Sequence, residues 1–365
     1  MSFLKNIFSK KDNSINSYQD FWNWFAKNEK EFFKAVGDRE IIEKNFLDKI
    51  SPKLNELREG YCFLAGMLND TTAELIITAD GNFKQFIFVE ELINSAPAIA
   101  GWKFTAFKPA MDIKRLSIEM GGDKFNDTNL SFYSNDLPEY PDEIDITVIH
   151  NDLSERNRKN ILNGTYIFLD NFLGELDFAT TIDNLEIIGK NEAKKELVPI
   201  EKLKDFLIWR EKEFVEKYEG TRHNTEKDNY SAFEAELRNG NPMIGVINTD
   251  LLKWDRKASH PWIIDIEIKF KDGNNGMPDK KTQQQLDDIE DKITAELKDF
   301  DGYLNVGRET ADNVRNIYFA CREFKKPSKI LTQVQSDLAG QLEFSYTIFK
   351  DKYWKTFNRF TGESN

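Results

Sequence analysis

The clearest alternation of hydrophobic and polar positions lies in the last third of the chain. The run WIIDIEIKF (Trp262–Phe270) alternates as a half-buried strand does. A loop rich in Gly and Asn follows, then an amphipathic helical stretch that carries Leu286, Ile289, Ile293 and Leu297. Two more strand patterns, a second helix and a closing strand complete the region. This order, β-α-β-β-α-β, predicts a ferredoxin-like sandwich.

The same alternation assigns strand residues to two faces of the predicted sheet. Ile264, Ile266 and Ile268 are expected under the helices, whereas the residues between them point the other way. In a ferredoxin-like sheet the first strand lies between the third and the fourth. The sequence therefore predicts an open polar face, which is solvated, packed on the N-terminal half, or used to bind a ligand or partner. Its candidate binding residues are Asp265, Glu267, Lys269, Tyr318 and Arg322.

The residues before this region mix helical and strand patterns. Aromatic residues recur at helical spacing over 17–36, and strands are expected at 61–68, 72–79 and 177–181. The pattern predicts a larger α+β domain with mostly antiparallel strands, either one domain or two subdomains. A helical start is expected just after residue 230, around Phe233. The predicted divisions are a flexible N-terminus at 1–16, the α+β domain at 17–217, a polar linker at 218–229 and the ferredoxin-like domain at 230–365.

Composition narrows the classes of function. Hydrophobic residues make up 40% and aromatic residues 13% of the chain, which is typical of a folded protein. The net charge of −13 disfavours general nucleic-acid binding and suits a solvated monomer or a basic partner. No stretch of the sequence is long and apolar enough to span a membrane, and the N-terminal MSFLKNIFSKK lacks the apolar core of a signal peptide. A cytoplasmic location is therefore expected.

The sequence presents no motif for catalysis, a cofactor or a metal. The three histidines, His150, His223 and His260, are far apart and have no ligand spacing around them. Cys62 and Cys321 lie in apolar runs and are expected to be buried, reduced thiols. GGDKF (121–125) resembles the GGDEF signature of diguanylate cyclases, but Lys124 stands where that family has an acid. A Gly-Gly-Asp turn between two strands explains these residues.

Several short stretches of the last third resemble a known family. They are the strand Trp262–Phe270, GMP (276–278), IED (289–291), VGRET (306–310), IYFACRE (317–323) and YTIFKDKYW (346–354). Over roughly residues 240–360 they resemble the bacterial domain-of-unknown-function family 695, which implies a fold and no established activity. A fold-level similarity to the B-type regulator of ribonuclease E suggests, by analogy alone, an inhibitory role between proteins. The N-terminal part resembles the extra region of longer, uncharacterised members.

Two classes of function follow from these observations. The favoured hypothesis is a cytoplasmic, non-enzymatic interaction or regulatory protein with a basic or ribonuclease-like partner. The alternative is an enzyme with a site between the two halves of the chain, built from carboxylates and arginine. Its expected residues are Asp265, Glu267, Arg322 and Arg308. Neither hypothesis gives the oligomeric state.

Overall fold

The computed structural model describes residues 14–271 and 274–361. Contacts between residues divide the chain into two compact units, with the boundary between Pro109 and Ala110. This division falls inside the region predicted as one domain or two. The expected flexible N-terminus at 1–16 lies, apart from residues 14–16, outside the described residues.

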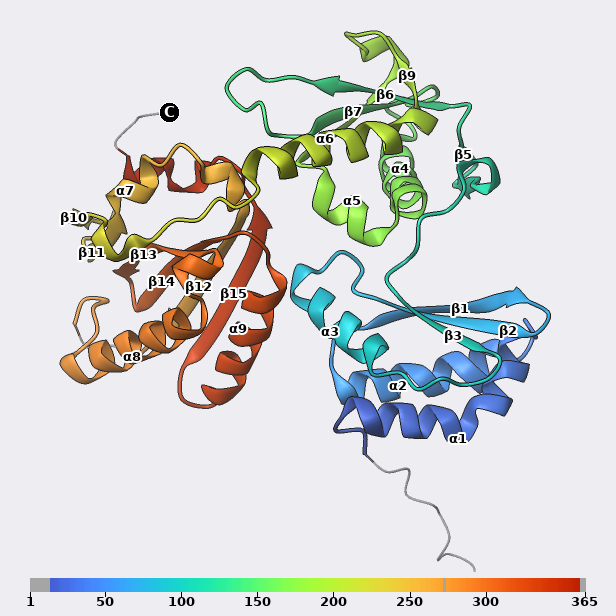
Figure 1. The fold of residues 1–365 in the computed structure, drawn as a ribbon, viewed down its shortest axis with the longest axis horizontal. Helices are drawn as coiled ribbons and strands as arrows, with labels where there is room; N and C mark the ends of the chain where they lie inside the picture. The colour runs from blue at the N-terminus through green and yellow to red at the C-terminus, as the bar shows by residue number, and fades with distance from the viewer. Residues whose placement is uncertain (1–13, 272–273, 362–365) are drawn as a thin grey trace, which may run out of the picture. The chain divides into compact units, whose positions relative to one another are not determined.

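The first unit is a three-stranded sheet with helices (Figure 1). Strand β2 lies in the middle, antiparallel to β1 and parallel to β3. Ser17 caps the first helix, which buries Phe21, Trp22 and Phe25 because these aromatic residues recur on one helical face. The elements are α1 (Tyr18–Val36), α2 (Asp48–Leu57), β1 (Cys62–Asn69), β2 (Thr72–Thr78), α3 (Phe83–Asn94) and β3 (Trp102–Ala106).

The two cysteines differ in exposure. Cys321 is fully buried, as predicted, but Cys62 is exposed. The prediction for Cys62 was wrong because its apolar run forms β1, which, among the described strands, pairs with β2 alone and lies at the edge of the sheet. An edge strand leaves side chains uncovered whatever their hydrophobicity.

The middle part of the second unit contains a four-stranded sheet of order β8-β7-β6-β9, of which Figure 1 labels β6, β7 and β9. Ile146 and Val148 of the central strand join a core with Ile161, Phe168 and Leu203 from two helices. The stretch 177–181, predicted as a strand, is helical. The elements of this middle part are β6 (Leu130–Asn135), β7 (Asp145–His150), α4 (Arg158–Leu173), α5 (Glu175–Thr181), β8 (Asn184–Gly189), β9 (Val198–Pro199) and α6 (Leu203–Tyr218).

The GGDKF stretch forms the predicted turn. Strand β4 (Ile118–Met120) pairs with β5 (Asp123–Phe125) in a hairpin. Gly121 and Gly122 at its tip have φ of 61° and 89°, a region of backbone conformation that glycine reaches without strain.

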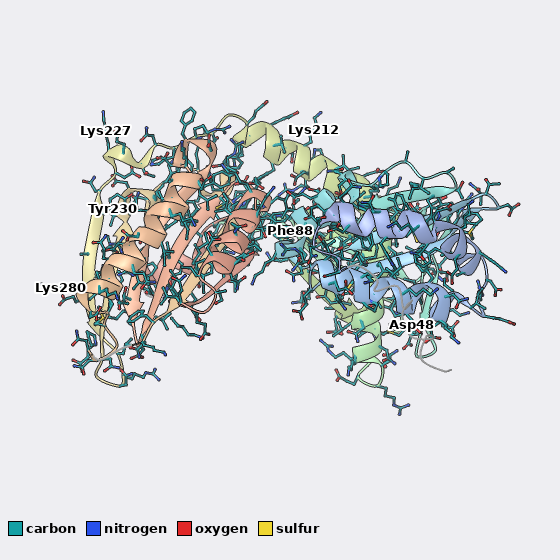
Figure 2. All side chains as sticks on the ribbon, turned by 90° about the horizontal axis from the view of Figure 1, so that it is seen from below. Asp48, Phe88, Lys212, Lys227, Tyr230 and Lys280 are labelled. Carbon is teal, nitrogen blue, oxygen red and sulfur yellow. The ribbon has the colours of Figure 1, made fainter. Side chains whose placement is uncertain are left out.

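The unit ends in a six-stranded antiparallel sheet of order β10-β11-β13-β14-β12-β15. The helical start expected after residue 230 is wrong, because residues 230–236 form a strand that pairs along its whole length with residues 242–248. Tyr230, the first residue of this strand, is labelled in Figure 2. The strands are β10 (Tyr230–Glu236), β11 (Pro242–Asn248), β12 (Trp262–Lys269), β13 (Tyr303–Ala311), β14 (Val314–Cys321) and β15 (Glu343–Lys350).

Both faces of this sheet are at least partly covered. Helices α8 (Lys280–Glu296) and α9 (Lys325–Asp337) lie on one face (Figure 1). On the other, the short helix α7 (Thr249–Leu252) and the 3-10 helix η8 (Lys355–Phe360) contribute to a second hydrophobic core. Its members include Ile247, Leu251, Ile263, Tyr318, Trp354 and Phe357. The face expected to be open and polar therefore carries a buried apolar core, to which α7 and η8 contribute.

Candidate functional site

Polar side chains gather on the part of this second face next to the apolar core. In register, Asp265 of β12 lies opposite Tyr318 of β14. Asn316 lies opposite Glu267 on one side and Glu309 of β13 on the other. Directly opposed residues of antiparallel strands point to the same face. Three carboxylates, from β12 and β13, therefore lie on either side of β14. We call this group, completed by a guanidinium from η8, the carboxylate face: Asp265, Glu267, Glu309, Asn316, Tyr318 and Arg359.

Hydrogen bonds hold the carboxylate face in place. Asn316 Nδ2 donates to Asp265 Oδ1 at 2.9 Å, and the Tyr318 hydroxyl donates to Glu309 Oε1 at 2.7 Å. Arg359 Nη2 donates to the Tyr318 hydroxyl at 2.8 Å and lies 3.0 Å from Glu309 Oε1. Glu309 Oε2 is buried and has no hydrogen-bond partner among the described residues. The face thus contains an acceptor that its own side chains leave unsatisfied.

Burial raises the pKa of two residues of the carboxylate face, Asp265 and Tyr318. Desolvation raises the pKa of Asp265 above its ordinary value, and the neighbouring Glu309 adds to the rise, while Asn316 and Arg359 oppose it. Desolvation, together with Glu309, also raises the pKa of Tyr318, so its phenol stays protonated. A carboxyl group with a raised pKa holds a negative charge at a cost that a bound cation would offset.

The structure brings together four of the five residues predicted for this surface. The same side of the sheet carries Asp265, Glu267, Lys269 and Tyr318. Lys269 Nζ lies 3.4 Å from a carboxylate oxygen of Glu267 and 2.5 Å from one of Glu343. Tyr318, expected to face solvent, is only 2% exposed because η8 covers it. Arg322 follows β14 and packs against Gly302, whose carbonyl accepts a hydrogen bond from its backbone N–H at 3.0 Å.

Sequence reasoning missed Glu309, Asn316 and Arg359. No local pattern placed Glu309, because the buried positions of residues 303–311 do not alternate and the pairing register shifts between Asn305 and Gly307. No local pattern pointed to Arg359, because η8 reaches the sheet only through tertiary packing.

Arg308 lies in a different charge network, between β13 and α8. Its Nη1 donates to Glu290 Oε2 at 2.9 Å, and Asn305 donates to the other Glu290 oxygen at 3.0 Å. Arg315, only 3% exposed, donates to Asp287 at 2.6 Å. Arg308 is thus engaged on the helix-covered side, whereas Asp265 and Glu267 lie on the other, so these residues do not converge on one site.

A cleft lies where the middle part of the unit meets the end of the chain. Two neighbouring cavities, of about 620 and 240 Å³, share Glu143, Asn184 and Lys355 in their linings. The larger cavity has a polar floor, where Asn135 donates to Asp145 and Thr147 at 2.9 Å each. Lys194 and Lys195 also line it. This cleft is large enough for a small polar molecule.

Two of the three histidines come close to one another around Trp254. The His223 ring lies 5.1 Å and the His260 ring 5.3 Å from the Trp254 ring. His223 Nε2 lies 2.8 Å from Asp228 Oδ2, and His260 is fully buried. Within residues 14–271 and 274–361, no three His, Cys, Asp or Glu side chains are placed to hold a metal ion.

The resemblance of the last third of the chain to a known family is confirmed. Residues 229–361 match DUF695, a family of unknown function. No curated protein and no solved structure matches the chain. In the described residues, no helix is long and apolar enough to cross a membrane.

The stretches that resemble DUF695 have structural roles in this chain. Glu290 of IED and Arg308 of VGRET bond to each other, joining α8 to the sheet. Lys352 and Tyr353 of the closing stretch contact the middle part of the unit, through Asp183 at 2.7 Å and Asp142 at 2.8 Å. The carboxylate face also lies entirely within the DUF695 segment.

Proposed function

We propose that the protein is a non-enzymatic interaction or regulatory protein whose carboxylate face docks a basic partner protein. The observation that carries this proposal is the shortage of cations on the face. Asp265 has no ion pair among the described residues, Glu309 pairs only with Arg359, and Glu267 has Lys269 at 3.4 Å. The net charge of −13 supports attraction of a basic partner over a longer range.

The opposite side of the same strands provides the comparison. There, both Glu290 oxygens accept hydrogen bonds and Asp287 has the guanidinium of Arg315. The carboxylates with which α8 contacts the sheet are therefore matched with donors from the strands. The unmatched oxygens of the carboxylate face support a role in recognition.

The fold is compatible with such a role. We infer that the four strands in the order β13-β14-β12-β15, with α8 and α9 as connections, form a ferredoxin-like sandwich extended by β10 and β11. On the β15 side of the carboxylate face, Ser345 and Thr347 are exposed and lie opposite Glu267 and Asp265. A partner approaching from this side meets a polar strand before the carboxylates. We place the encounter in the cytoplasm.

The proposal is tested by chemical cross-linking in a lysate of the native cells. The full chain and the variant Asp265→Asn/Glu267→Gln/Glu309→Gln are compared, with Glu40→Gln/Glu43→Gln/Asp48→Asn as a control that removes three charges from the first unit. We expect cross-links from β12, β14 or β15 to basic segments of one partner, lost in the first variant and kept in the control. Cross-links that do not depend on these carboxylates would contradict the proposal.

The cleft favours an alternative, an enzyme acting at the joint between the two parts of the second unit. Asp145 and Glu186 on its floor have no ion pair among the described residues and lie near Lys194 and Lys195. This alternative predicts turnover of a small polar substrate that is lost in Asp145→Asn or Glu186→Gln and unaffected by the changes on the carboxylate face. Screening purified chain against a panel of small metabolites distinguishes the two.

A further inference from the structure

We propose that the carboxylate face is a guanidinium-binding site, filled at rest by Arg359 of the same chain, which receives an arginine side chain of a protein partner. The inference rests on the docking function proposed above and specifies the chemistry of recognition. It makes Arg359 an internal occupant that the partner's arginine replaces.

One carboxylate oxygen of Glu309 is buried and unsatisfied. This residue is 9% exposed, and its Oε2 has no hydrogen-bond partner among the described residues. Leaving a buried acceptor without a donor destabilises the fold, because the group has lost its water without gaining a hydrogen bond. Asp265 lies near enough for the Glu309 charge to raise its pKa, so the two carboxylates together attract a cation. The unpaired Glu309 Oε2 shows that Arg359 satisfies the hydrogen-bonding capacity of this carboxylate only in part.

Arg359 contacts the carboxylate face through one nitrogen of its guanidinium. Its Nη2 alone makes both contacts, to the Tyr318 hydroxyl at 2.8 Å and to Glu309 Oε1 at 3.0 Å. A well-placed guanidinium forms two parallel hydrogen bonds with the two oxygens of a carboxylate. Arg359 belongs to the short helix η8, and its side chain is 50% exposed. The contact is therefore incomplete and accessible to a competitor.

Aromatic rings next to the carboxylates favour one kind of cation. The Arg359 guanidinium lies 4.4 Å from the centre of the Phe360 ring and 5.5 Å from that of Tyr318. Planar guanidinium groups stack on aromatic rings and present donors in a fixed fork, whereas an ammonium group is a strongly hydrated point charge. Aromatic rings beside paired carboxylates favour arginine over lysine.

The test measures binding of Nα-acetyl-L-arginine amide to the full chain at low salt and pH 7, by chemical shift changes in ¹H–¹⁵N spectra. The neutral isostere Nα-acetyl-L-citrulline amide and the lysine analogue are measured in parallel. We expect weak binding of the arginine probe, at least threefold weaker binding of the lysine probe and none of the citrulline probe. Glu309→Gln should weaken arginine binding at least fivefold.

The decisive variant is Arg359→Ala, which removes the internal occupant. It should bind the arginine probe at least fivefold more tightly than the unmodified chain, whereas Arg210→Ala, which removes an arginine of α6, should leave binding unchanged. In addition, methylguanidinium should raise the unfolding temperature of Arg359→Ala more than that of the unmodified chain. Unchanged or weaker probe binding by a folded Arg359→Ala, or equal binding of the citrulline probe, overturns the inference.

The outcome also separates this inference from the broader function. If the arginine probe fails while the cross-linked partner still depends on the three carboxylates, docking stands and the guanidinium inference is wrong. If the probe binds as expected but no partner depends on the face, the guanidinium site exists and the proposed docking function fails.

Discussion

Lys352 and Asp183 join the end of the chain to the middle part of the second unit. Lys352 is 2% exposed, and its Nζ lies 2.7 Å from Asp183 Oδ2. The other oxygen of Asp183 lies 2.7 Å from Lys350 Nζ. Burial lowers the pKa of Lys352, with Lys350 adding to this effect and Asp183 opposing it. One carboxylate thus lies between two lysine side chains where the two parts of the unit meet.

Replacing this carboxylate should open the joint. We expect Asp183→Ala to destabilise the second unit by about 3–5 kcal/mol, because it leaves buried cations without their counter-charge. Hydrogen exchange should rise in peptides covering 142–145 and 350–353. Asp136→Ala, on the exposed rim of the nearby cleft, is the matched control and should change stability by less than about 0.5 kcal/mol. Equal exchange in the two variants would contradict the assigned role.

The network between α8 and the sheet gives a second prediction. Arg315 is 3% exposed and bonds to Asp287 at 2.6 Å, to Gln283 at 3.0 Å and to Thr310 at 3.0 Å. Arg315→Ala should cost about 3–5 kcal/mol, since three polar partners lose their donor. Arg308→Ala should cost less, because the Arg308 side chain is one-third exposed and water can replace it. Urea unfolding of both variants measures the two losses in free energy of unfolding. A larger loss in Arg308→Ala than in Arg315→Ala would contradict the prediction.

The buried His260 should make stability fall in acid. Burial, with the positive charges of Arg222 and His223 nearby, lowers its pKa from 6.5 to about 3. Below pH 6.5 His260 therefore takes up a proton in the unfolded chain but stays neutral in the folded chain. The contribution of His260 to the free energy of unfolding is complete above pH 6.5 and is lost as pH falls towards 3. The slope from this group is about 1.4 kcal/mol per pH unit. His260→Leu should reduce the slope of the free energy of unfolding against pH by that amount. Identical slopes in the variant and the unmodified chain would show that His260 does not have this lowered pKa.

Asp265 should show a conflict between stability and binding. Because its pKa is raised in the folded chain, the ionised carboxylate destabilises the fold above the unfolded pKa, and the penalty disappears as pH falls. Asp265→Asn keeps an oxygen for the hydrogen bond from Asn316 and removes the charge. We expect a higher unfolding temperature at pH 7 together with weaker binding of the arginine probe. A variant that loses stability at pH 7 would contradict this account of the desolvated carboxylate.

Much of the terminal sheet could be predicted because its strands alternate strongly. The run Trp262–Phe270 fixed a strand, and its odd-numbered residues Asp265, Glu267 and Lys269 do share one face. The errors came where local pattern was ambiguous. Residues 177–181 and the stretch after 230 are short, and pairing or packing with distant residues decided whether they became helix or strand.

The sequence by itself determined the α+β composition, the β-α-β-β-α-β order of the last third and the face on which Asp265 lies, since these follow from the periods of helices and strands. Only tertiary structure decided that η8 folds back over Tyr318, that Arg359 meets Glu309 and that Lys352 meets Asp183. These contacts join residues separated by about forty to one hundred and seventy positions, over which local periodicity carries no information about proximity. The charge pairing of the candidate site therefore depends on which segment covers the sheet.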